Sequence, residues 1–434
     1  MRGLFGLAVA AATGLFSQSL ARPLIATPGD INSVVVTVDN TVNGTVPATD
    51  AILGSNPLNF ALTNNIGGDQ LYAYVSGRDA NDQVVLLTTS GGFYYPDPAG
   101  SAVPVAIPDD AGHAIPLGAQ GEVTNFAIPD YISSGRLWIS AGQLSFFSLV
   151  AGDGKISLVE PSFNNPSDPS AGLNWGFVEL TNNEGGIYTN ISFVDFIGLV
   201  MSMRLTLGSG EVQTVQGLEP GSLEQICQGL KDQAAIDGQP WDKMCVTRED
   251  GTPLRILAPN QYIATNPGSM DAYYADYIDQ VWEKYTNEDL LIDTQGEWGQ
   301  VPCRVSGDQM TCQGDTIAYP KPTMVDVWGC NSGPFANQGD LLHQRIVARM
   351  CAAFYRTELL LDGGNVTPSL GSESYYTVSP TSHYSRLIHQ YEVDQKGYAF
   401  SFDDVNVSNE NQAGVLAGAD PQLLEVFVGG GLVV

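Results

Sequence analysis

The sequence predicts a mainly β protein with an α/β insertion: a β-sandwich or barrel lobe, a mixed α/β lobe, and a cleft between them. Short β-like runs separated by Gly, Pro, Asn and Asp occupy residues 22–206, and they return over 375–434. Helical periodicity and all six cysteines lie between these regions, in residues 207–374. A chain of 434 residues is also too long for one small core, which favours two lobes.

Residues 1–21 have the order of a secretory signal peptide. One positive charge at Arg2 precedes an uncharged apolar run over 3–16, and small residues occupy positions 19 and 21. That run is too short to cross a bilayer, and no later stretch reaches the roughly 18 apolar residues of a membrane helix. We therefore expect cleavage after Ala21 and an extracellular product, free or associated with a cell wall, without a membrane partner.

The net charge and the cysteine pattern limit the kinds of partner and cofactor that the chain could bind. A net charge of −29 argues against nucleic acid, whose binding surfaces need lysine and arginine, and it suits a soluble monomer. Six cysteines in an exported chain predict three disulfides, with the connectivity left open: Cys227, Cys245, Cys303, Cys312, Cys330 and Cys351. No Cys-x-x-Cys pair or zinc-like histidine spacing occurs, so we expect neither a metal nor another cofactor. Four sequons fit a eukaryotic, for instance fungal, secretory route: Asn43, Asn190, Asn365 and Asn406.

The individual elements follow from local patterns. Strands of the β lobe are predicted where aromatic and aliphatic runs end at turn residues, at 71–75, 84–88, 92–95, 136–139 and 144–147. Three amphipathic helices are predicted at 221–238 behind a Ser222 N-cap, from Ser269 to Tyr285, and over 338–359. We interpret the Tyr/Trp stripe of the second helix as core. Further strands are predicted at 290–292, 324–327, 375–378 and 397–402.

The most informative segment is 174–196. Glu179, Thr181 and Asn183 alternate with Val178 and Leu180, so a strand would place the three polar side chains on one face. A carboxylate, a hydroxyl and an amide on one face suit the recognition of sugar hydroxyls. The alternative is an ordinary solvent-facing sheet surface.

Asp195 does not fit simple alternation, because its neighbours in phase are apolar. A hairpin turning near Ile187 would place Asp195 opposite Glu179, but it would also place Phe193 opposite Thr181. A β-bulge that redirects Asp195 would resolve this conflict. Asp195 is then either a buried structural acceptor or a functional carboxylate with a tuned pKa.

Two carboxylates on neighbouring strands can carry out glycoside hydrolysis, in which one donates a proton and the other stays ionised. Inverting enzymes separate the two by about 6.5–9.5 Å and retaining enzymes by about 5 Å. The spacing in the sequence leaves both open.

The segments 177–182 (Phe-Val-Glu-Leu-Thr-Asn) and 188–198 (Tyr-Thr-Asn-Ile-Ser-Phe-Val-Asp-Phe-Ile-Gly) resemble the signature of glycoside hydrolase family 64. Segments 58–65, 134–138 and 398–405 are also similar, so the resemblance covers most of the mature chain. Members of that family are inverting endo-β-1,3-glucanases related in fold to thaumatin-like proteins. The resemblance implies a thaumatin-like β lobe and a β-1,3-glucan as the partner.

The resemblance also implies roles for single residues. Glu179 would be the general acid and Asp195, sixteen positions later, the general base. Thr181 and Asn183 would contact glucan, and Tyr188 stands where the family commonly has Trp.

Three further residues complete the predicted site. Asp403 and Asp404 resemble the Tyr-Asp-Asp element of thaumatin-like clefts, with Phe402 in place of the Tyr; turn capping is the alternative. Asn190 lies in the same block as the catalytic pair, so we expect it to remain unglycosylated and to face the substrate.

The predicted function is a secreted endo-β-1,3-glucanase that uses single displacement and no cofactor. A non-catalytic thaumatin-like β-glucan-binding protein is the competing class. Transglycosylation is a third hypothesis, and it would need a covalent intermediate and therefore a close carboxylate pair.

Overall fold

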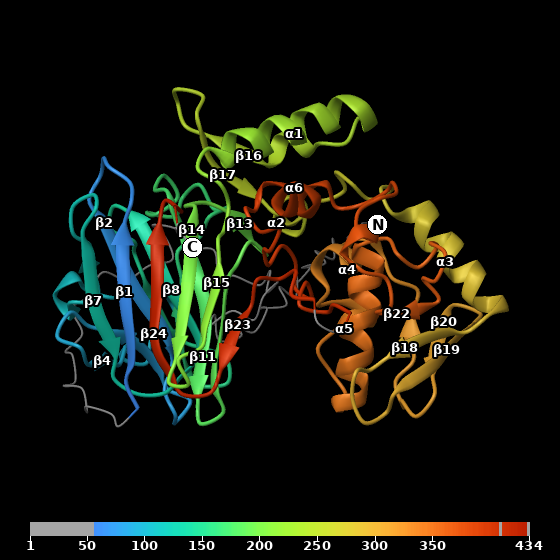
Figure 1. Ribbon diagram of the computed structural model, residues 1–434, viewed down its shortest axis with the longest axis horizontal. Helices are drawn as coiled ribbons and strands as arrows, with labels where there is room; N and C mark the ends of the chain where they lie inside the picture. Colours follow the sequence, from blue (N-terminus) through green and yellow to red (C-terminus); the bar gives the residue numbers. More distant parts are fainter. Residues whose placement is uncertain (1–55, 408–409, 432–434) are drawn as a thin grey trace, which may run out of the picture.

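The computed structural model describes residues 56–407 and 410–431; the predicted signal peptide lies outside them (Figure 1). Two lobes stand side by side, a β lobe and a mixed α/β lobe, with α1 and the β16–β17 hairpin above them (Figure 1). No helix in the described part of the chain is both long and apolar enough to span a membrane.

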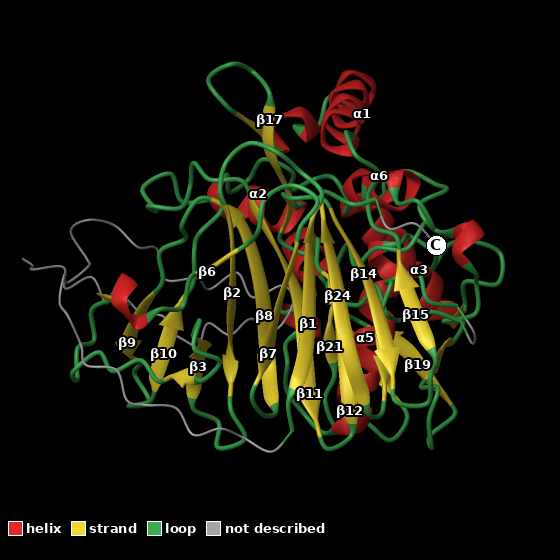
Figure 2. Cartoon of the chain, turned by 60° about the vertical axis from the view of Figure 1, so that its left-hand side comes forward, coloured by secondary structure: helices red, strands yellow, loops and turns green. Residues whose placement is uncertain are grey.

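The β lobe is a two-sheet sandwich. Its smaller sheet has the order β15 (Val212–Val215), β14 (Met201–Leu207), β24 (Pro421–Val428), β1 (Leu58–Asn64) and β7 (Val123–Ile128). The strand β24 is parallel to β1 and antiparallel to β14, so a segment from the C-terminal region lies in the middle of this sheet (Figure 2). One of the C-terminal strands that were expected to return to the β lobe, β24, thus lies in the centre of its smaller sheet.

The larger sheet carries the segment with the two predicted catalytic carboxylates. Its order is β23 (Leu416–Gly418), β12 (Gly186–Ile191), β11 (Trp175–Asn183), β8 (Ile132–Ala141), β2 (Leu71–Arg78), β3 (Val84–Leu87) and β4 (Phe93–Tyr94), and β6 (Ile115–Pro116) also pairs with β2. A third small sheet contains β5 (Val105–Ala106), β9 (Phe147–Val150) and β10 (Ile156–Val159). The sheets of the described chain form no closed barrel, so the sandwich alternative is the correct one.

In the larger sheet, strand alternation places core residues on one face and the residues of the candidate site on the other. Val178 pairs with Leu137, and both are fully buried in the main hydrophobic core. One residue further along, Glu179 pairs with Arg136, which in turn pairs with Ser76 on β2. Because successive side chains point to opposite faces, these three polar residues share the face opposite Val178 and Leu137.

The α/β lobe packs helices against short sheets. Its helices are α1 (Ser222–Asp237), α2 (Pro259–Thr265), α3 (Ala275–Asn287), α4 (Met324–Gly329), α5 (Leu341–Tyr355) and α6 (His383–Tyr391). Its sheets are β21 (Tyr319–Pro320), β20 (Gln309–Cys312), β19 (Gln300–Ser306), β18 (Leu290–Asp293) and β22 (Val366–Thr367) in that order, and β13 (Phe196–Ile197), β17 (Pro253–Leu257) and β16 (Cys245–Thr247). The three predicted disulfides are present and pair cysteines in sequence order: Cys227–Cys245, Cys303–Cys312 and Cys330–Cys351.

Several predicted elements are wrong for local reasons. Residues 324–327 form helix α4 instead of a strand, because Thr323 and Asp326 make a capping box. Residues 375–378 are not a strand, since Tyr376 has a φ of 58°. Over 397–402 the backbone N–H of Ala399 donates to the Asp403 carboxylate and not to a neighbouring strand.

The boundaries of three other predicted elements differ from those in the structure. The N-cap position of α1 is Gly221, one residue before Ser222. Helix α3 begins at Ala275, after a series of turns that follows Ser269. The strand predicted at 144–147 is found at Phe147–Val150.

Candidate active site

The hairpin of β11 and β12 positions the first predicted carboxylate. Its turn lies at Glu184 and Gly185, not near Ile187, and Gly186 has a φ of 112° that favours glycine. Glu179 therefore lies opposite Asn190, and Thr181 lies opposite Tyr188. Directly opposed residues share a face, so the side chains of Glu179, Thr181, Tyr188 and Asn190 lie on the same face of the sheet.

Asp195 reaches the site by a different route from the predicted bulge. Strand β12 ends at Ile191, and Asp195 lies in the connection before β13. Its backbone carbonyl accepts a hydrogen bond from Ala258 N, and its Oδ1 accepts one of 2.7 Å from Gln261 Nε2 on α2. A helix of the α/β lobe therefore orients this carboxylate, which strand periodicity could not predict.

Arg136 on β8 brings the two predicted carboxylates and a third one together. Its Nη2 lies 3.2 Å from Glu179 Oε1 and 3.8 Å from Asp195 Oδ2, and its Nη1 lies 2.8 Å from Oε2 of Glu160, directly after β10. The guanidinium packs over the Phe177 ring at 4.3 Å. We call Arg136, Glu160, Glu179 and Asp195 the Arg136 centre.

The Arg136 centre contains one cation and three carboxyl groups. Burial raises the pKa of Glu179 above its ordinary value, and Asp195 acts in the same direction while Arg136 opposes it. Burial likewise raises the pKa of Glu160. The carboxyl side chains still keep exposures of 9% for Glu160, 11% for Glu179 and 8% for Asp195, so solvent reaches them. Such a centre can hold a proton near neutral pH and can still contact a ligand.

Four buried polar atoms in this neighbourhood lack a well-formed hydrogen bond within the described chain: Oε2 of Glu179, Oδ1 of Asn190, Nε of Arg136 and Oγ of Ser192. The Ser192 hydroxyl still lies close enough to Glu179 to act as a donor that opposes the rise of its pKa. Buried polar atoms are normally satisfied by protein or water. A sugar hydroxyl or a water molecule would satisfy the oxygens of Glu179 and Asn190, which are on directly opposed residues.

Tyr188 and Asp404 meet across two elements. Tyr188 is 40% exposed, and its hydroxyl donates to Asp404 Oδ2 at 3.2 Å. The Tyr398 hydroxyl donates to the other oxygen, Oδ1, at 3.0 Å. Asp404 therefore fixes the hydroxyl end of an aromatic ring that remains available to a ligand.

Asp403 lies elsewhere, contrary to the prediction that it binds substrate. It is fully buried, and its carboxylate accepts from Arg356 Nη2 at 2.8 Å, from the Ala399 N–H at 2.9 Å and from His389 Nε2 at 3.1 Å. These contacts fix the segment around residue 400 against α5 and α6. We call Arg356, Asp403 and His389 the Arg356 centre.

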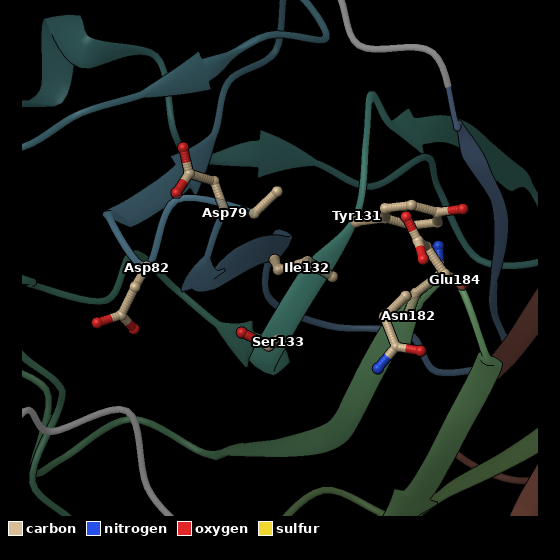
Figure 3. Close-up of a pocket in the computed structure, with 9 residues that line it drawn as sticks. Asp79, Asp82, Tyr131, Ile132, Ser133, Asn182 and Glu184 are labelled. Atoms are coloured by element: carbon tan, nitrogen blue, oxygen red, sulfur yellow. The ribbon is translucent and has the colours of Figure 1, made fainter.

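Asn183 lies at the far end of β11, where its Oδ1 accepts from Gly185 N at 2.8 Å. It lines a pocket of about 480 Å³ together with Asn182 and Glu184. Figure 3 shows that the other walls come from the β2–β3 turn and the start of β8. The structure thus separates Asn183 from the Arg136 centre by the length of strand between positions 179 and 183.

Sequence reasoning missed Arg136, Glu160 and Gln261. The first two had a detectable signal, since each is a charged residue adjoining an apolar strand run, 137–139 and 156–159. Gln261 had none. Among the described residues, no group of three or more His, Cys, Asp or Glu side chains is arranged to hold a metal ion.

Comparison with known proteins identifies the family of the chain. The glycoside hydrolase family 64 model, described as Beta-1,3-glucanase, matches residues 56–428. A glucan endo-1,3-beta-glucosidase of Cellulosimicrobium cellulans is 30% identical over 379 residues, which are 86% of this chain and 65% of that protein; one of an Arthrobacter strain matches to the same extent. The chain thus spans 65% of the length of these curated relatives.

Solved structures show the same fold. A laminaripentaose-producing beta-1,3-glucanase in complex with laminaritetraose is 28% identical, with a TM-score of 0.75 over 86% of this chain and 99% of that one. A beta-1,3-glucanase domain from Clostridium beijerinckii is 22% identical, with a TM-score of 0.68 over 87% of this chain and 100% of that one. The predicted family resemblance is confirmed: the chain belongs to glycoside hydrolase family 64.

Proposed function

We propose that this chain is a secreted endo-β-1,3-glucanase that hydrolyses internal linkages by a single inverting displacement. Asp195 takes a proton from a water molecule, whose oxygen attacks the anomeric carbon. Glu179 donates its proton to the glycosidic oxygen as the bond to the leaving sugar breaks. The observation that carries the proposal is the Arg136 centre, which holds two carboxyl groups of unequal environment beside one cation.

The two environments support the two roles. Burial raises the pKa of Glu179, which keeps a proton available for the leaving oxygen. Asp195 accepts a short hydrogen bond from Gln261, and this contact stabilises a carboxylate anion. Arg136 donates to Glu179 Oε1, so Oε2 is the oxygen we assign to the donated proton.

The separation of the two groups bears on stereochemistry. Both carboxylate oxygens lie near the same nitrogen, Arg136 Nη2, at 3.2 and 3.8 Å, so they are at most about 7 Å apart. This limit admits an inverting pair with an intervening water and also the closer pair of a retaining enzyme or a transglycosylase. Membership of family 64, taken with the resemblance described above, favours inversion.

Glucan contacts are proposed for Thr181, Tyr188 and Asn190, which share the face of Glu179, and for Asp404 through Tyr188. Asn183 would contact the chain further along the strand. Secretion is supported by the order of residues 1–21 and by the pairing of all six cysteines, which is typical of oxidising compartments.

The test is incubation of the mature protein with laminarin, with reducing ends and the anomeric form of the first product followed by NMR. We expect release of α-anomeric oligosaccharides by the native chain and strongly reduced release by Glu179→Gln and Asp195→Asn. Glu249→Gln, which removes a charge from an exposed turn, is the matched control. Binding of laminarin without release by the native chain would favour the non-catalytic alternative, and a β-anomeric product would identify a retaining enzyme.

A further inference from the structure

A polar pocket lies at the end of β11, beyond the Arg136 centre, and Asn183 is the only one of its residues with a role proposed above. The pocket has a volume of about 480 Å³, and we call it the β11-end pocket. Its walls are the β2–β3 turn, residues 131–133 at the start of β8, and residues 182–184 (Figure 3). We propose that the β11-end pocket is an auxiliary site that binds sugar units of a β-glucan away from the bond that is cleaved. The identity of this ligand rests on the proposed function.

Asn182 is the residue of the pocket that points to a ligand. It is only 4% exposed, yet its side-chain amide makes no hydrogen bond within the described part of the chain. Buried polar groups normally have a partner, so an unpaired amide in the wall of a pocket is a binding group without its ligand. A single sugar hydroxyl can accept from the amide nitrogen of Asn182 or donate to its oxygen.

A β-bulge separates the pocket from the part of the sheet that carries the Arg136 centre. Leu180 and Asn182 are two steps apart on β11, but their partners on β8, Gly135 and Ile132, are three steps apart. Ser134, within this bulge, has a φ of 47°, which lies in the left-handed region. Bulges redirect side chains and are common next to binding sites. The pair beyond the bulge, Ile132 and Asn182, lines the pocket.

The pocket and the catalytic carboxyl group lie on different parts of β11. Glu179 and Asn182 are three positions apart, so their side chains point to opposite faces of the sheet and are separated by about 10 Å along the strand. A sugar bound to Asn182 is therefore not the sugar that receives a proton from Glu179. This placement makes the pocket an auxiliary site.

The acidic residues of the pocket are already engaged. Asp82 lies 3.2 Å from Arg78 Nη1 and 3.1 Å from Lys155 Nζ, and Asp79 accepts hydrogen bonds from backbone N–H groups of its own turn. Among the described residues, no lysine or arginine lines the pocket, so an anion would meet no cation in its walls. The same residues include no group of acidic, His or Cys side chains arranged to hold a metal ion. These observations disfavour a charged ligand.

The groups that remain available suit a neutral sugar. Within the described chain, the hydroxyls of Tyr131 and Ser133 and the carboxylate of Glu184 have no hydrogen-bond partner, and they line the pocket with Asn182. Sugar hydroxyls both donate and accept, so they match an amide, two hydroxyls and a carboxylate. Tyr131 is half-buried, which leaves part of an aromatic ring for contact with the apolar C–H groups of a sugar.

The test is adsorption to insoluble β-1,3-glucan, measured in the Glu179→Gln background so that the polymer is not digested. Asn182→Ala and Tyr131→Ala should each raise the Kd for adsorption by about 2- to 10-fold, the effect of losing one hydrogen bond or ring contact. Asn287→Ala removes an exposed amide at the end of α3 and is the matched control, with an unchanged Kd. Tyr131→Ala provides the test if Asn182→Ala does not fold.

Soluble laminaritetraose separates the pocket from the cleft. With Glu179 restored, the pocket variants should lose rate on the insoluble polymer and keep kcat/KM on this short chain, because a second anchor acts only on a long chain. Unchanged adsorption in both variants would overturn the auxiliary site, as would an equal fall of kcat/KM on laminaritetraose. If the native chain hydrolyses no glucan but the variants still adsorb more weakly, the proposed function fails and the auxiliary site stands.

Discussion

The described chain contains two buried arginine–carboxylate centres that differ in how many carboxyl groups share the cation. In the Arg356 centre, both oxygens of Asp403 have donors, and His389 and Arg356 hold the pKa of Asp403 below its ordinary value although burial acts to raise it. In the Arg136 centre, one cation contacts three carboxyl groups, and burial raises the pKa of Glu160 and of Glu179. A carboxylate with a donor on each oxygen fixes the chain, whereas carboxyl groups that share one cation are available for proton transfer.

The largest expected difference is in activity. Glu179→Gln should reduce laminarin hydrolysis by about 10²- to 10⁴-fold, which is the range for losing a general acid. Its unfolding temperature should stay at or above the native value, because Gln keeps the shape of the side chain and replaces a carboxyl group whose ionisation burial disfavours. Reducing-end release and thermal unfolding measured on the same sample check both expectations. Full activity in this variant would place the acid elsewhere.

The second difference is in stability. Asp403→Asn should destabilise the fold by about 3–5 kcal/mol, because it leaves the buried Arg356 without its anion. Denaturant unfolding gives the free energy, and the rate per folded molecule should fall far less than in Glu179→Gln. A stable but inactive Asp403→Asn variant would instead support the predicted role of Asp403 in substrate binding.

A change in pH should also affect the stability that the two centres contribute in opposite directions. The folded pKa of Glu160 and of Glu179 is raised above 4.5, so their contribution to stability is full below that value and is lost as pH rises through the folded pKa. The pKa of Asp403 is lowered from 3.8, so its contribution is present above 3.8 and is lost as pH falls further. Unfolding temperatures across pH 3–9 should show the alkaline loss shrinking in Glu160→Gln and the acid loss shrinking in Asp403→Asn. Unchanged profiles in both variants would contradict this assignment.

The smallest expected effect concerns the contact beside the Arg136 centre. Tyr188→Phe removes the hydrogen bond to Asp404 but keeps the aromatic face, so it should cost about 0.5–1.5 kcal/mol. We expect this cost mainly as a higher KM for laminarin, with kcat nearly unchanged. Tyr188→Ala, which also removes the ring, should raise KM further. Equal KM values for the two variants would mean that the ring makes no contact with glucan.

The sequence predicted the residues that local periodicity controls. Alternation on β11 correctly placed Glu179 and Thr181 on one face, and the cysteine count predicted the three disulfides. Asp195 resisted prediction because the strand ends before it and a contact with Gln261, 66 positions later, orients it. The prediction that Asp403 binds substrate rests on its resemblance to the Tyr-Asp-Asp element of thaumatin-like clefts, and its contact with Arg356, 47 positions earlier, leaves no local trace in the sequence. In both cases the deciding contacts are tertiary.

The central position of β24 has a consequence for the order of folding. Glu425 on β24 pairs with Arg204, 221 positions earlier, and Gln422 accepts from Asn59, 363 positions earlier. The smaller sheet therefore cannot close during synthesis until β24 has emerged, while the α/β lobe, which is synthesised earlier, contains three short-range disulfide loops. We expect the inserted lobe to become protease-resistant first. A nascent chain truncated before β24 would then contain every residue of the Arg136 centre and yet lack the sheet that supports it.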